Sequence, residues 1–297
     1  QFLLSAIQAL AFVVVGNTIM GIKGMYTEYW IVLFSAWATA NVMGLLISDS
    51  FRTVVTIYIL IPFLVIPQMI LGGAMFSFDK LNSSIGGGQA RTPVIADVMA
   101  TRWAYEALAV TQFRDNPFQK AYYETDRIES MASYKQAFFI PELEKLVRGS
   151  KGILEQQEVN GNGLEENLSL LRAEISSELE LIPGLEFSRL DQLYPATVSE
   201  AILEEVEVWL EELNEVYVDL FNAVGRKRED IKKDMAPGQD PDEYFRDMRN
   251  RHQNDFLADL VRKSRAEDKI LREGNRLLQL ADPVFLFPQA STCSFRV

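Results

Sequence analysis

The sequence predicts an all-α membrane protein, in which three transmembrane helices are joined to a large external α-helical domain that contains a long antiparallel helix hairpin. Two observations predict this fold class. Residues 1–73 contain two acidic and two basic side chains, so the formal net charge of −12 falls on residues 74–297. The first part is a series of apolar runs, whereas the second part carries apolar residues at the three- and four-residue spacing of amphipathic helices.

The first domain, residues 1–78, contains three charge-free runs, at residues 2–22, 29–48 and 53–73. Each is close to the roughly 20 residues that a helix needs to cross a bilayer core. The connectors are short, so consecutive helices are antiparallel neighbours. Each connector carries one basic and one acidic residue, and the positive-inside rule therefore gives no orientation.

Polar and helix-breaking residues interrupt these apolar runs. Asn17 and Asn41 allow two interpretations: they bond between packed helices, or they face a translocation path. Pro62 and Pro67 lie in the third run. Because each lacks a backbone donor, neighbouring helices or a wet cavity must accommodate that part of the helix.

Residues 79–121 are expected to form an external loop and an amphipathic helix at the membrane surface. The run Gly86–Gly88 has no following Lys-Ser/Thr, so it is a flexible connector and not a phosphate-binding loop. The helix covers Arg102–Phe113. Its Arg102 and Glu106 are four residues apart and predict an exposed ion pair that contributes only about 0.3–0.5 kcal/mol.

Residues 122–290 are predicted to form an acidic helical domain outside the membrane. A first helix is interrupted at Pro141. The hairpin follows, with one helix from Thr197 to Arg226, where Thr197 is the N-cap of a capping box, and a second from Asp242 to Leu280. Trp209 lies on the apolar stripe of the first of these and should be buried. Residues 291–297 are an unstructured or truncated end.

Composition argues against several classes of function. One cysteine and one histidine cannot build a multi-thiolate or histidine-rich metal centre, and the acidic charge disfavours nucleic acid as a partner. No HExxH or CxxC pattern occurs. We therefore expect no catalytic, cofactor-binding or metal-binding residues in this chain. Because it begins within an apolar run, we interpret it as a piece of a longer polypeptide.

One stretch resembles a known family. The apolar run carries Pro67-Gln68 and ends in Gly72-Gly73-Ala74, and after a loop comes an Arg-Trp-Ala-Tyr-Glu-Ala-Leu helix from Arg102 that closes on Gln112-Phe113. This pattern resembles the fifth transmembrane helix and the following external helix of the permease domain of G-type ABC exporters. Met43–Ser48 is similar to the end of the fourth helix. The resemblance covers Leu3–Asp126, from the third transmembrane helix into the external region, but the sixth transmembrane helix of the family pattern is missing.

The resemblance implies that this chain is the C-terminal part of a permease, providing path, gate and external cap, within an integral protein of the bacterial inner membrane. Residues 74–297 would be mostly extracytoplasmic. Expected partners are membrane lipid, a second copy in a homodimer, and a nucleotide-binding domain, upstream or in trans, that holds ATP and magnesium. The family pattern maps the gate to Ala74 and Met75, the cavity lining to Ile66 and Met69, and the outer-mouth helix to Arg102, Tyr105 and Glu106. Asn17 and Asn41 join the candidate cavity lining because of their depth in the apolar runs. Met69 and Met75 could equally only fill gaps between packed helices.

A second function class explains fewer of these features. In it, the chain is a membrane-anchored structural or scaffolding protein, whose three helices only hold an extracytoplasmic coiled-coil domain. This alternative accounts for the helix hairpin. It gives no reason for the Pro-Gln, Gly-Gly and Arg-Trp-Ala-Tyr-Glu-Ala-Leu features.

Overall fold

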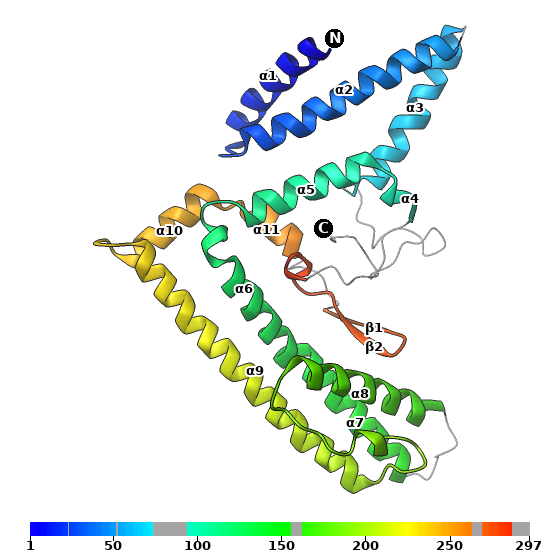
Figure 1. The fold of residues 1–297 in the computed structure, drawn as a ribbon, viewed down its shortest axis with the longest axis vertical. Helices are drawn as coiled ribbons and strands as arrows, with labels where there is room; N and C mark the ends of the chain where they lie inside the picture. The colour runs from blue at the N-terminus through cyan, green and yellow to red at the C-terminus, as the bar shows by residue number, and fades with distance from the viewer. Residues whose placement is uncertain (23, 52, 74–93, 156–161, 263–268, 287–297) are drawn as a thin grey trace. The chain divides into compact units, whose positions relative to one another are not determined.

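The structure is a computed structural model that describes residues 1–22, 24–51, 53–73, 94–155, 162–262 and 269–286. Within these ranges the chain divides into two compact units. The first unit comprises residues 1–120 and 246–262, and the second comprises residues 121–245 and 269–286. Each unit is described by itself (Figure 1).

The first unit contains the three expected apolar helices, α1 (Phe2–Met20), α2 (Tyr26–Ser50) and α3 (Val54–Leu71). All three are long and apolar enough to span a membrane, which confirms this part of the prediction. Helix α1 packs along α2 through a stripe of small and polar residues at four-residue spacing, Ser5, Ala9, Val13 and Asn17. Small side chains at these positions let the two helix backbones approach.

The described part of the first unit also contains α4 (Val94–Asp97), α5 (Ala100–Arg114) and α11 (Asp255–Arg262), together with residues 246–252 of a further helix. Helix α5 is central, because it contacts α2, α3, α4 and α11. Helix α11 begins at a cap, where the Asn254 side chain accepts the backbone N–H of Leu257 at 3.1 Å. It buries Leu257, Ala258 and Val261.

The second unit is built on long helices: α6 (Gln119–Tyr134), the π-helical turn η3 (Lys135–Phe139), α7 (Ile140–Glu155), α8 (Asn162–Leu181) and α9 (Glu200–Met235). Helix α7 packs against both α8 and α9. The core that they share contains leucines of all three helices together with Trp209, which is 2 % exposed. The predicted burial of Trp209 is therefore confirmed.

The chain does not break at Pro141, and that expectation was wrong. A proline inside a helix lacks the N–H for residue i−4 and clashes with that carbonyl. Here the helix widens into the π turn η3 just before the proline, and the N–H of Ile140 bonds the carbonyl of Lys135. The wider turn lets α6 and α7 run on through Pro141.

Helix α9 also starts differently from the prediction. Its N-cap is Ser199, which makes no side-chain capping bond. Thr197 instead donates its hydroxyl to the carbonyl of Gln192 at 2.9 Å. Thr197 is therefore not the capping residue. Its bond fixes the segment before α9, and this segment contains the short 3-10 turn η4 (Leu190–Gln192).

The prediction of a single long helix over Asp242–Leu280, the second helix of the hairpin, was wrong. The chain forms α10 (Pro241–His252), then α11, and then an antiparallel β hairpin of β1 (Ile270–Glu273) and β2 (Arg276–Gln279), followed by the 3-10 turn η5 (Pro283–Phe285). Gly274, the first of the two turn residues, has a positive φ of 58°. Two-residue hairpin turns need a positive φ at this first position, and glycine adopts it readily.

Candidate functional site

Helix α5 is bonded at both ends to apolar helices of the first unit. Near its start, the Thr101 hydroxyl donates to the carbonyl of Gln68 at 3.0 Å, close to the end of α3. In its second half, Gln112 accepts the hydroxyl of Tyr29 at 3.1 Å, close to the start of α2. If α2 and α3 span a membrane as consecutive antiparallel helices, the start of α2 and the end of α3 lie on the same side of that membrane. Helix α5, which bonds both, then lies on that side as well.

A cluster of charged residues surrounds the first turns of α5. The Nη1 of Arg102 binds the carboxylate of Asp97, at the end of α4. Trp103 donates its indole N–H to the backbone carbonyl of Asp97 at 2.8 Å, and the Arg102 guanidinium lies 4.7 Å from the centre of that indole ring. Asp97 thus fixes the start of α5, whose N-cap Met99 makes no side-chain bond.

Glu106 is the second carboxylate of this cluster. Its Oε2 lies 3.5 Å from the Nη2 of Arg102, yet among the described residues its Oε1 and the Nη2 of Arg102 are buried without a hydrogen-bond partner. Burial raises the pKa of Glu106 to about 7, and the Arg102 charge opposes this rise only in part. Glu106 is therefore poised to gain or lose a proton near neutral pH.

The predicted Arg102–Glu106 pair forms, but its expected exposure was wrong. Arg102 is 2 % and Glu106 is 6 % exposed. Both lie with Ala109 and Phe113 on the buried face of α5, whereas the neighbouring Trp103 is 42 % exposed. The small free energy of a surface pair does not apply to charges that have left water.

The remaining predicted residues are distributed differently. Asn41 donates to the Ser5 hydroxyl at 2.6 Å, between α2 and α1, which favours helix packing over a cavity role. Asn17 is buried, and its side-chain nitrogen has no hydrogen-bond partner in the part of the chain that the structure describes. Ile66 and Met69 are about half exposed on α3. The predicted gate residues Ala74 and Met75 lie outside the described residues.

Tyr105 is partly buried on α5, and burial raises the pKa of its phenol. It belongs to the same helix as the charged cluster, as the sequence predicted. Asp97, the Thr101–Gln68 bond and the packing of α11 against α5 were not predicted from the sequence. An acidic residue five positions before Arg102 was the available signal for Asp97, since a short turn before a helix can bring such a residue onto its first turns.

The ion pairs and hydrogen bonds of this cluster fix charged side chains at the start of α5. Within the described ranges, no three His, Cys, Asp or Glu residues are grouped so that they could hold a metal ion. Comparison of the chain with protein-family models, with curated proteins and with solved structures gives no match.

Proposed function

We propose that this chain is part of the permease of an ATP-driven exporter of the G-type class, in which α1, α2 and α3 border the translocation path and α5 closes over its outer end. The proposal begins from the sequence resemblance between Pro67 and Phe113. ATP would be hydrolysed by a nucleotide-binding domain outside this chain, and the permease would act as a homodimer. Residues beyond the apolar helices would then be extracytoplasmic.

The observation that carries the proposal is that α5 bonds the end of α3 through Thr101 and the start of α2 through Gln112, and that it carries the buried Arg102 and Glu106 between these two residues. Burying Arg102 and Glu106 costs several kcal/mol of desolvation, which their attraction only partly returns. A helix that merely rested on the surface would not need this cluster. A helix that must hold the ends of α2 and α3 in register during a transport cycle would use it for positioning.

The scaffolding alternative has lost its main support. It depended on a long antiparallel coiled-coil hairpin, and the chain forms a β hairpin at residues 270–279 in place of the second helix. A simple anchor also gives no reason for the bonds Thr101–Gln68 and Tyr29–Gln112. We therefore favour transport.

The first experiment isolates the native complex. A tag on this chain is used to purify it from its native membranes in mild detergent, and the polypeptide or its co-purified partner is sequenced and assayed for magnesium-dependent ATP hydrolysis. A phosphate-binding loop with vanadate-sensitive hydrolysis supports the exporter. A complex with neither feature refutes it.

The second experiment tests the role of α5 in that complex. We expect Arg102→Ala to change the rate of ATP hydrolysis at least threefold, although the ATP site lies elsewhere, because the variant removes the ion pairs that fix the first turns of α5, next to the Thr101 bond to α3. The control is Arg114→Ala on the same helix, where the arginine side chain is 56 % exposed. Equal rates for both variants and the wild type would show that α5 does not couple to the ATPase.

A further inference from the structure

An open groove of about 590 Å³ lies within the second unit. Its floor is the outer surface of α8, one wall is the segment that precedes α9, and the other side is marked by the turn of the β hairpin. The residues that line it are Ser169, Arg172, Ala173, Ser176, Ser188, Leu190, Asp191, Tyr194 and Asn275.

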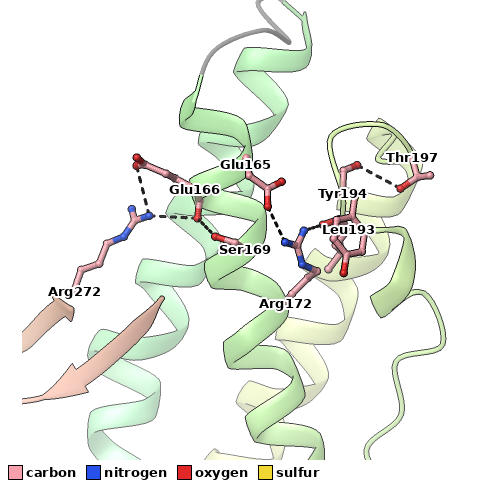
Figure 2. Close-up of polar contacts among 8 residues, drawn as sticks. All are labelled: Glu165, Glu166, Ser169, Arg172, Leu193, Tyr194, Thr197 and Arg272. Atoms are coloured by element: carbon pink, nitrogen blue, oxygen red, sulfur yellow. Dashed lines mark hydrogen bonds and ion pairs between the residues drawn. The ribbon is translucent and has the colours of Figure 1, made fainter. Parts of the chain in front are cut away.

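The wall before α9 is fastened to the floor by Arg172. Its Nη1 donates to the backbone carbonyl of Leu193, and its Nη2 donates to Glu165 at 2.9 Å (Figure 2). The guanidinium also lies 3.8 Å from the centre of the Tyr194 ring. Arg172 thus fixes the position of the tyrosine that borders the groove.

The hairpin is fastened to α8 independently. Arg272 donates to the carbonyl of Glu166 at 3.3 Å (Figure 2), and the backbone N–H of Leu277 donates to Glu174 at 2.6 Å. Bonds within the second unit hold both sides of the groove in place. A site held in this way loses little conformational entropy on binding.

Most residues of the lining have polar side chains, and their charges are nearly balanced. The lining contains one guanidinium, which Glu165 already pairs, and one carboxylate, Asp191, which is exposed. The hydroxyls of Ser169, Ser176 and Ser188 and the amide of Asn275 offer both donors and acceptors. Such a set suits a neutral ligand with many hydroxyl groups better than an ion.

Tyr194 adds an aromatic surface to this polar lining. Arg172 covers part of the ring, but the residue remains 48 % exposed. An aromatic ring offers an apolar face against which the C–H groups of a sugar ring can stack, while the sugar hydroxyls bond neighbouring polar groups. The volume is also within the range of small-molecule sites.

We propose that this groove binds a saccharide, with one sugar ring stacked on Tyr194 and its hydroxyls bonded to Asp191, Asn275 and the α8 serines. The site is independent of the exporter proposal, because it lies wholly within the second unit. Binding can be measured without nucleotide or transport. Its failure and the failure of the transport proposal are therefore distinguishable.

The test uses the whole chain, purified in lauryldimethylamine oxide so that no sugar detergent competes. Saturation-transfer difference NMR screens malto-, cello-, xylo- and N-acetylchito-trisaccharides, and titration gives the Kd of those that bind. We expect at least one to bind. Tyr194→Ala should weaken it at least tenfold, whereas Tyr194→Phe, which keeps the ring, should stay within threefold of the wild type.

A second pair of variants guards against misfolding. Asp191→Asn changes an exposed side chain and should weaken binding at least threefold, and Asp219→Asn, at an exposed position on α9, should leave the Kd unchanged. Binding by none of the four saccharides overturns the proposal. So does binding that Tyr194→Ala and Asp191→Asn leave intact, or binding of short peptides in place of saccharides.

Discussion

Replacing Lys135 with methionine should destabilise the second unit strongly. Lys135 is the first residue of the π turn, and its Nζ lies 2.5 Å from the Oε1 of Glu178 on α8. Tyr217 on α9 donates its hydroxyl to the other oxygen of Glu178 at 2.5 Å. The lysine Nζ also lies 3.5 Å from the centre of the Phe139 ring. One buried carboxylate therefore joins three helical segments.

The magnitude follows from the burial of the two charges. The Glu178 side chain is 3 % exposed and that of Lys135 is 15 % exposed. Lys135→Met removes the cation and leaves the carboxylate buried with one neutral donor, which costs about 3–5 kcal/mol of unfolding free energy. The double variant Lys135→Met/Glu178→Gln removes both charges of the pair and leaves only the neighbouring carboxylate of Glu174 buried, so we expect at least half of this loss to be recovered.

Trp209 provides the assay, because it is the one tryptophan of the second unit in the sequence. Urea unfolding is followed by its fluorescence in a background where Trp30, Trp37 and Trp103 are phenylalanine. Lys145→Met is the control, since that side chain is 71 % exposed and pairs with Glu142 on the surface. A Lys135→Met loss below about 1 kcal/mol, the size expected for a surface pair, would refute the reasoning.

Two further predictions concern the first unit and the topology. The folded pKa of Glu106, about 7, lies above its ordinary value of 4.5, so the folded state holds the extra proton and stability falls as pH rises between these values. Thermal unfolding followed by Trp103 fluorescence should show a loss of about 1–3 kcal/mol between about pH 5 and pH 8, and Glu106→Gln should abolish it; an unchanged slope would contradict this. In cells, cysteines placed at Ser133 and Ser199 in a Cys293→Ser background should react with an impermeant reagent if the second unit is extracytoplasmic, and protection of both would reverse that topology.

The apolar helices were predictable because their signal is local. A charge-free run of bilayer length specifies a helix whatever surrounds it, and α1, α2 and α3 lie within a few residues of the predicted bounds. The stripe that carries Trp209 was predictable for a similar reason, since four- and three-residue spacing marks the buried side of a long helix.

The sequence does contain a signal for the β hairpin at residues 270–279, where a helix was predicted. Phe256 and Leu260 are spaced as on a helix, and α11 indeed contains both. Gly274-Asn275, however, stands between Ile270-Leu271 and Leu277-Leu278, which is the pattern of a two-residue β hairpin. The apolar spacing was extended through this turn, and a strand pair was interpreted as helix.

The burial of the charged cluster could not be predicted in the same way. Whether Arg102 and Glu106 face solvent depends on what packs against α5, and one of those elements is α11, about 150 positions later in the sequence. In the sequence, an ion pair at i,i+4 on an exposed helix cannot be distinguished from one on a buried helix. Only the packing of distant segments decides between a pair worth a few tenths of a kcal/mol and one that carries the cost of desolvation.

The π turn shows how one local irregularity can determine long-range contacts. A π turn adds a residue to the helix and so rotates the side chains before it relative to those after it. Here Tyr134 is buried, Lys135 bonds Glu178 on α8, and Gln136 donates its side-chain amide to the backbone carbonyl of Tyr217 on α9 at 2.9 Å. Three consecutive residues thus all contribute to packing or to bonds with two other helices. In a regular α-helix, three consecutive side chains do not lie on one narrow stripe. Pro141 therefore does not break the helix. It follows the π turn whose residues bond α8 and α9.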